Sequence, residues 1–246
     1  MPKNNQKGAL MQGIKAVFID IDNTLLDFNK YVENVMKDGF ERFNIGKFEP
    51  YMYDVFESVN NELWDKIERG EIDFITLRKI RWNLVFERIG YSFDGIAFEN
   101  YFRECLFNSA IPISGAYELL DYLKGKYIIC IASNGPHLQQ KHRIELAEMD
   151  KYIDYYFTSE RMGVSKPNEE YYIKCLNELN ANRDVKIEKE EILVIGDSLS
   201  SDIYGSKKFG LKTCLYERKT VLNKKLENIA DYTVEDLKDI INILKD

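Results

Sequence analysis

The sequence predicts an α/β fold: a doubly wound, mostly parallel, Rossmann-like sheet interrupted by an inserted all-helical domain. From about residue 109 onward, short apolar runs alternate with amphipathic stretches, which is typical of parallel strands joined by helices. One further apolar run lies near the start, and the stretch after it carries helical periodicity with almost no strand signal. These observations predict a split sheet domain, residues 1–27 with 109–246, and a helical domain at residues 28–108.

The composition is that of a globular protein, with 246 residues, 45% of them apolar and 30% charged. The net charge of −7 argues against a broad surface for a nucleic-acid polymer or anionic lipid. It leaves room for a small phosphorylated metabolite held in a local positive pocket. The four cysteines are widely spaced without a Cys-x-x-Cys pair, so we expect reduced thiols in a cytoplasmic protein.

The N-terminal stretch up to Lys15 lacks an apolar segment adequate for a signal peptide, and we expect it to be a loose tail. No apolar run reaches membrane-spanning length, so no membrane partner is expected. The first strand is expected over Ala16–Ile19, directly before Asp20 and Asp22. If the extended backbone continues to Asp22, its two-residue repeat places both carboxylates on one side.

The inserted domain is predicted to be a bundle with a core of aromatic rings, a few of which could instead line a substrate cavity. Apolar side chains at spacings of three and four residues mark one face of its central helix. The expected helices are one around residues 31–36 that ends near Gly39 or Gly46, one over 52–67 ended by Gly70, one over 74–89 ended by Gly90, and one over 98–107.

The second part of the sheet domain is expected to alternate helices and strands, with glycine, proline and serine in the turns. In order, the expected elements are a helix over 116–124, a strand over 127–132, a polar helix, a strand over 155–158, a helix that Pro167 can start, a strand over 191–195, a helix through Asp202, strands over 211–216 and 230–234, and a helix over 235–244.

Polar residues follow the predicted strands in a regular order. The first group is Asp20, Asp22 and Thr24, and the later ones are Ser133, Lys166, and Asp197 with Asp202. Open α/β sheets bind ligands at the carboxyl ends of their strands, so we expect these side chains to meet. Adjacent carboxylates repel each other and usually coexist around a cation.

These motifs, read in order as DIDNT, ASNG, SKP and GDSLSSD, resemble those of the haloacid dehalogenase (HAD) superfamily. The resemblance covers the whole sheet domain. The helical insertion falls where the C1-type cap of that superfamily lies. The resemblance implies a hydrolase that uses Mg²⁺, an ion that prefers oxygen ligands and bridges phosphate.

By this resemblance Asp20 is the nucleophile and Asp22 is the general acid and base. The metal ligands would be the carboxylates of Asp20 and Asp197 and the backbone carbonyl of Asp22. Lys166 would supply a fixed positive charge for the phosphoryl group. Simpler interpretations compete with these roles: Asp22 could cap a turn, and Lys166 could be an ordinary solvated lysine.

Ser133, with the amides of Asn134 and Gly135, is expected to bind the substrate phosphate together with Lys166, although Ser133 could also be a simple turn residue. Three residues are expected to support the site. Thr24 would orient the loop, and Asp202 would make a second or additional contact to the metal. Ser198 could assist at the metal or cap a helix.

The retained second carboxylate, Asp22, favours phosphoryl transfer over dehalogenation. The expected function is therefore hydrolysis of a phosphate monoester through an aspartyl-phosphate intermediate. The runs DIDNTLLDF, SNG with Gln139 and Gln140, and SERMGVSKPNEEYY are similar to those of the pyrimidine 5′-nucleotidase branch.

A phosphatase acting on phosphoglycolate or a sugar phosphate is the main alternative. A phosphomutase and a binding protein that has lost turnover are further ones. The oligomeric state does not follow from the sequence, because cap contacts and subunit contacts both use apolar helix faces.

Overall fold

The computed structural model describes residues 11–217 and 229–244, and the chain forms two compact units. One unit takes in the chain up to Asp27 and from Pro112 onward, and the other is Phe28–Ile111. We call them the sheet unit and the helical unit. The second boundary therefore falls at Pro112, against residue 109 expected from the sequence.

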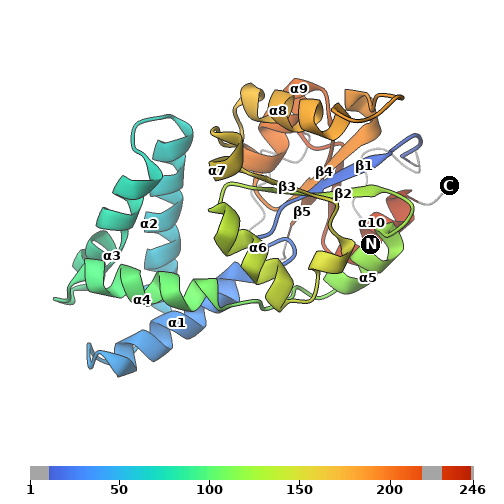
Figure 1. Ribbon diagram of the computed structural model, residues 1–246. Coiled ribbons are helices and arrows are strands. Elements are labelled where there is room, and N and C mark those ends of the chain that lie inside the picture. The colour runs from blue at the N-terminus through green and yellow to red at the C-terminus, as the bar shows by residue number, and fades with distance from the viewer. Residues whose placement is uncertain (1–10, 218–228, 245–246) are drawn as a thin grey trace. The chain divides into compact units, whose positions relative to one another are not determined.

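The sheet unit is built on a six-stranded parallel sheet in the order β3-β2-β1-β4-β5-β6 (Figure 1). The predicted doubly wound α/β fold is confirmed. β1 lies at the centre, where Phe18 pairs with Cys130 on one side and Val194 on the other. The strands are β1 Ala16–Ile19, β2 Ile128–Ser133, β3 Tyr155–Thr158, β4 Ile192–Gly196, β5 Lys212–Tyr216 and β6 Tyr232–Val234.

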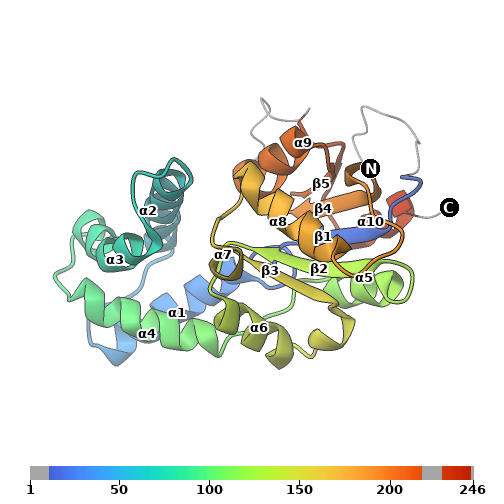
Figure 2. The ribbon, with the colours of Figure 1, turned by 45° about the horizontal axis from the view of Figure 1, so that its top comes forward.

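Helices cover both faces of this sheet, which is why its central strands are apolar throughout (Figure 2). Helices α5 (Ala116–Leu123), α6 (His137–Leu146) and α10 (Leu237–Leu244) lie on one face, and α8 (Glu169–Asn180) and α9 (Gly205–Phe209) lie on the other. Rings from the strands and from α8 pack together on the second face, among them Phe18, Phe157 and Tyr171. Because all the strands are parallel, their carboxyl ends lie at one edge of the sheet, and the polar residues gather there.

Some boundaries of the sheet unit differ from those predicted. The expected loose tail is wrong for its last residues, because Met11 and Ile14 are buried and the Met11 amide donates to the Ile243 carbonyl (3.0 Å). Residues 1–10 lie outside the described part. The helix expected at Pro167 begins at Glu169, because Asn168 caps it and accepts from the Glu170 amide (2.9 Å). Among the described residues, none of the helices combines the length and apolar character needed to cross a membrane.

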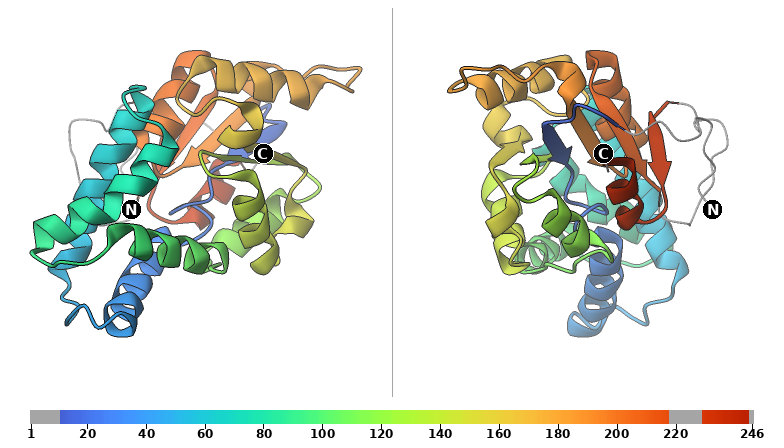
Figure 3. Two further views of the ribbon diagram at one scale, coloured as in Figure 1. Left: turned by 60° about the vertical axis from the view of Figure 1, so that its left-hand side comes forward. Right: turned by 90° about the vertical axis from the view of Figure 1, so that its right-hand side faces the viewer.

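The helical unit contains α1 (Phe28–Arg42), α2 (Tyr51–Glu68), α3 (Phe74–Ile89) and α4 (Gly95–Phe107), with α3 packed against both α2 and α4 (Figure 3). Helix α1 runs past Gly39 and ends at Arg42, between the two glycines that were expected to end it. A Cβ atom at Gly39 would lie 2.7 Å from the Phe98 ring, so glycine allows α4 to approach α1 closely. Gly90 ends α3 in the left-handed conformation, as expected from the sequence.

The interior of the helical unit combines aromatic rings with one buried ionic group. Trp82, Phe98 and Phe102 are almost completely buried, and the Trp82 ring contacts both phenylalanines. Beside them, Arg81 Nη2 donates to both oxygens of Glu99 at 2.9 Å, and Arg81 Nη1 donates to Asn60 Oδ1 at 3.0 Å. The rings therefore serve as core, as predicted, and the ionic group is an addition that the sequence did not suggest.

Candidate active site

The loop after β1 carries both aspartates that the sequence placed together. The strand ends at Ile19, and a tight turn follows in which Asn23 has φ 60° and the Leu26 amide donates to the Ile21 carbonyl (2.8 Å). The Asp20 amide still donates to the Ile195 carbonyl of β4 (2.9 Å), and the turn begins only after Asp22. Asp22 lies near enough for its charge to raise the pKa of Asp20, and each aspartate has its own cationic partner, described below.

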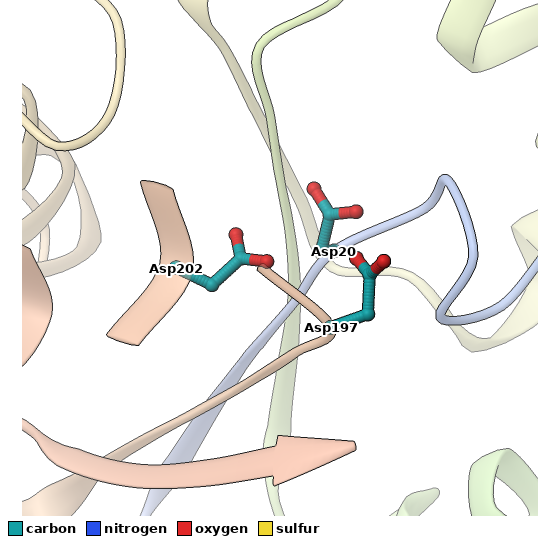
Figure 4. Close-up of side chains that lie close together, drawn as sticks. All are labelled: Asp20, Asp197 and Asp202. Atoms are coloured by element: carbon teal, nitrogen blue, oxygen red, sulfur yellow. The ribbon is translucent and has the colours of Figure 1, made fainter. Parts of the chain in front are cut away.

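Asp20, Asp197 and Asp202 form one cluster, with a carboxylate oxygen of each within 4.8 Å of the others. Figure 4 shows the carboxylates of Asp20 and Asp197 close together and that of Asp202 directed toward them. Asp20 follows β1 and Asp197 follows β4, and these neighbouring strands bring them together. Lys166 Nζ lies between two of the acids, 2.7 Å from Asp20 Oδ1 and 2.6 Å from Asp202 Oδ1.

The charges in this cluster are not balanced. Burial raises the pKa of Asp20 to about 7; Lys166 pulls it down and Asp202 pushes it up. Burial and the neighbouring acids also raise the pKa of Asp197 well above its usual value. Burial alone would lower the pKa of Lys166, but Asp20 and Asp202 raise it above the usual value, so the ammonium stays charged. The cluster holds more carboxylates than Lys166 can neutralise, and its oxygen donors fit the predicted Mg²⁺ ion.

Lys166 is built into the site. Its side chain is 2% exposed and donates to the Ala132 carbonyl at 2.6 Å, which rules out the interpretation of an ordinary solvated lysine. The Asn134 side chain holds the backbone of Lys166 at both ends: Asn134 Nδ2 donates to the Lys166 carbonyl, and Asn134 Oδ1 accepts from its amide, each at 2.9 Å. The Asn134 side chain thereby orients Lys166, a contact that the sequence did not suggest.

The residues predicted to support the site are close to this cluster. Asp202 is 1% exposed and also accepts from the Ser198 amide (3.0 Å), and a Cβ at Gly196 would lie 2.2 Å from Asp202 Oδ2. Ser198 Oγ accepts from the Ser201 amide (3.2 Å) and caps η3 (Leu199–Tyr204), a wide helical turn. Of the two roles considered for Ser198, the helix cap is thus the one observed. Thr24 is fully buried, and its hydroxyl has no hydrogen-bond partner within the described part of the chain.

Asp22 and Ser133 belong to a second group, in which two side chains were not predicted. Arg143 Nη1 donates to Asp22 Oδ1 (2.7 Å), and Gln140 Nε2 donates to Asp22 Oδ2 (2.9 Å) and Ser133 Oγ (2.8 Å). From the sequence, Gln140 was noted only as part of the motif that begins with SNG, and no role was predicted for it. The signal for Arg143 was its position three residues later, which puts both on one helical face with Ile144.

Comparison with known proteins finds one matching family model and several similar proteins. The family model "haloacid dehalogenase-like hydrolase" matches residues 14–210. The chain is 28% identical to the pyrimidine 5′-nucleotidase PynA of Streptococcus pneumoniae, over 94% of this chain and 97% of that protein. It is also 28% identical to the glyceraldehyde 3-phosphate phosphatase of Pyrococcus furiosus, over 96% and 95%.

A solved structure of the Bacillus subtilis HAD-hydrolase YfnB bound to magnesium is similar as well. It has a TM-score of 0.84 and 27% sequence identity, and the match covers 96% of this chain and all of that one. The resemblance inferred from the four motifs is confirmed by these matches.

Proposed function

This chain belongs to the haloacid dehalogenase-like hydrolase family, and we propose that it is a Mg²⁺-dependent phosphatase that acts through an aspartyl-phosphate intermediate. The observation that carries the proposal is the cluster of Asp20, Asp202 and the half-buried Asp197, in which Lys166 contacts the first two. When bound, Mg²⁺ would be held by Asp20, Asp197 and the Asp22 carbonyl, and would supply positive charge to the phosphoryl oxygens.

In the first half of the proposed reaction, a carboxylate oxygen of Asp20 attacks the phosphorus atom of the monoester. The bond between phosphorus and the ester oxygen breaks, and Asp22 gives its proton to that leaving oxygen. Lys166 keeps Asp20 in place and offsets charge on the phosphoryl group, and the Ser133 hydroxyl donates to a phosphoryl oxygen. The products of this half are the free alcohol, the phosphorylated Asp20 and an ionised Asp22.

In the second half, water attacks the phosphorus atom of phosphorylated Asp20. Asp22 takes a proton from the water, the bond from phosphorus to the Asp20 oxygen breaks, and inorganic phosphate leaves. Asp22 is protonated again and Asp20 is an ionised carboxylate, so the site has returned to its starting state.

For the substrate, we favour a nucleoside 5′-monophosphate, with a sugar phosphate or phosphoglycolate as the second candidate. The nucleotidase PynA and the glyceraldehyde 3-phosphate phosphatase are equally similar to this chain, and both support a small phosphorylated metabolite. Values of kcat/KM for a panel of pyrimidine and purine nucleotides, sugar phosphates and phosphoglycolate decide between these candidates. A sugar phosphate or phosphoglycolate whose kcat/KM exceeds that of every nucleotide would overturn the first choice.

The chemistry is tested with p-nitrophenyl phosphate in the presence of Mg²⁺ or EDTA. We expect turnover only with Mg²⁺, and its loss in Asp20→Asn. Asp184→Asn, a change of the same kind at an exposed loop position, is the matched control and should behave as wild type. Equal rates in wild type and Asp20→Asn would favour a binding protein without turnover. Conversion of a sugar phosphate into an isomer without release of inorganic phosphate would favour a mutase.

A further inference from the structure

Helix α6 contributes two buried polar side chains to the site, Gln140 and Arg143, each 1% exposed. Burying a guanidinium and an amide is costly unless hydrogen bonds replace the lost water. The two side chains form hydrogen bonds with each other and with site residues. Arg143 Nη1 donates to Gln140 Oε1 (2.9 Å) and to Asp22 Oδ1 (2.7 Å).

Arg143 determines which way the amide of Gln140 points. A guanidinium can only donate, so the group that faces it must be the amide oxygen. The amide nitrogen of Gln140 is then directed at Asp22 Oδ2 (2.9 Å) and Ser133 Oγ (2.8 Å). Its two hydrogens match these two acceptors, so a single side chain joins the two site residues.

The same bonds determine what the Ser133 hydroxyl can do. Ser133 Oγ accepts from Gln140 Nε2 (2.8 Å) and from the Gly135 amide (3.3 Å). A hydroxyl oxygen has two lone pairs and one hydrogen, so these donors occupy both lone pairs and leave the hydrogen to be donated. A phosphoryl oxygen is an acceptor, and Gln140 thus orients the hydroxyl to bind it.

The carboxylate of Asp22 is held at both oxygens, one by Arg143 and the other by Gln140, although its side chain is 35% exposed. The backbone makes room for this arrangement at Gly135, where a Cβ would lie 2.6 Å from Gln140 Nε2. Glycine at this position therefore lets Gln140 reach across the turn.

We propose that Gln140 and Arg143 are positioning residues of the phosphatase reaction: Arg143 orients the amide of Gln140, and Gln140 fixes the proton carrier Asp22 relative to the phosphate-binding Ser133. The proposal rests on the proposed function, because it takes from it the roles of Asp22 and Ser133. It predicts that the loss in a Gln140 variant depends on how much the leaving group needs a proton.

The test measures kcat/KM, which reports the first half of the reaction, for p-nitrophenyl phosphate and for an alkyl phosphate. The p-nitrophenolate ion leaves without a proton, whereas an alkoxide needs one. We expect Gln140→Met to lose about 10- to 100-fold with the alkyl phosphate and no more than about three-fold with the aryl ester. The matched control is Gln139→Met, the neighbouring glutamine on α6, which should keep the wild-type ratio.

Three further variants separate position from chemistry. Gly135→Ala removes no polar group but pushes Gln140 aside, so it should reproduce the substrate-dependent loss. Arg143→Lys keeps a positive donor and should recover part of the loss seen in Arg143→Met. Equal losses for both substrates in all four variants would mean a merely structural role and would overturn the proposal.

A measurement without turnover distinguishes failure of this inference from failure of the proposed function. Thermal unfolding of Arg143→Met, Asp22→Asn and the double variant forms a cycle for the contact between the two side chains. We expect the shifts in Tm to be non-additive. Additive shifts would overturn the anchoring of Asp22 whether or not the protein is active. Inactive wild-type protein with non-additive shifts would overturn the proposed reaction and leave the anchoring supported.

Discussion

Two buried ionic groups, one in each unit, differ in their balance of charge. In the helical unit, Arg81 pairs with Glu99, and their side chains are 7% and 4% exposed. In the sheet unit, Lys166 pairs with Asp20 and Asp202, with exposures of 2%, 12% and 2%. The first group has one cation for one carboxylate. The second has Asp197 as a third carboxylate and still one ammonium.

The balance of charge distinguishes the two groups better than burial or a raised pKa does. The pKa of Glu99 is raised, with burial as the largest cause, as is that of Asp20. Only around Asp20, however, do further carboxylates add to the shift. The guanidinium of Arg81 also lies 4.6 Å from the centre of the Phe102 ring, and this cation–π contact further stabilises the buried charge. A balanced group stabilises a fold, whereas an excess of acids suits a site that receives a cation.

The largest effect should come from breaking the unbalanced group. Lys166→Met removes the one ammonium beside the nucleophile, so we expect kcat/KM for p-nitrophenyl phosphate to fall by at least about 10⁴-fold, about 5.5 kcal/mol. Lys174→Met, at a half-exposed lysine of helix α8, is the control and should retain activity. A loss below about ten-fold would show that the charge of Lys166 serves the fold and not the reaction.

Breaking the balanced group should instead lower stability. Arg81→Met leaves Glu99 buried without its cation, so we expect the helical unit to lose about 3–5 kcal/mol of unfolding free energy. Both tryptophans of the chain, Trp64 and Trp82, lie in this unit, so their fluorescence during urea unfolding reports on it alone. A double change, Arg81→Met with Glu99→Leu, should recover much of the loss. If the double change recovers none of the unfolding free energy, the unpaired charge of Glu99 is not the cause of the loss in Arg81→Met.

The excess of acids also predicts how pH and Mg²⁺ act on the sheet unit. The pKa of Asp20 is raised from 3.8 to about 7 in the fold, so its contribution to stability is fully present below about pH 4 and is lost as the pH rises through about 7. We expect the metal-free protein to lose about 4 kcal/mol over this range, since each pKa unit corresponds to about 1.4 kcal/mol. Because Mg²⁺ binds the ionised carboxylates, it should restore the loss at pH 8.

Thermal unfolding followed by far-UV circular dichroism, with Mg²⁺ or EDTA, measures this effect. Asp20→Asn should flatten the pH dependence, and Asp197→Asn should weaken the stabilisation by Mg²⁺. A metal-free protein whose stability rises between pH 4 and 7 would contradict the assignment, because the sign would then be that of an acid with a lowered pKa.

The sheet and the acidic cluster could be predicted from the sequence because strand order alone brings them together. The apolar run before Asp20 and the one before Asp197 form neighbouring strands, and parallel strands end at one edge. The partners of Asp22 could not be predicted in this way. Gln140 and Arg143 lie on helix α6, 118 and 121 positions further along the chain.

Contacts between side chains that lie far apart in the sequence could not be predicted either. The pairing of Asp22 with Arg143 spans 121 positions, and that of Arg81 with Glu99 joins two helices whose faces mix polar and apolar residues. A polar helix such as α6 is normally assigned to the surface, because periodicity arguments count only apolar side chains as buried. Such arguments therefore do not predict that an arginine is buried unless its acidic partner is already known.

The smallest effect should come from a second arginine on the same helix as Arg81. Arg88 donates to both oxygens of Glu62, at 2.8 and 2.7 Å, but these side chains are 40% and 50% exposed. The hydrogen bonds from Arg88 lower the pKa of Glu62 to about 2, so the stability from the pair is present above about pH 4.5 and lost as the pH falls through about 2. Water and salt screen such a pair, and Arg88→Met should cost less than about 1 kcal/mol in the tryptophan-monitored unfolding. Since Arg81 and Arg88 lie on the same helix and each pairs with a glutamate of its own, the difference between their costs measures what burial adds to an ion pair. Equal costs would mean that helix α3 itself, and not the buried pair, governs the stability of the helical unit.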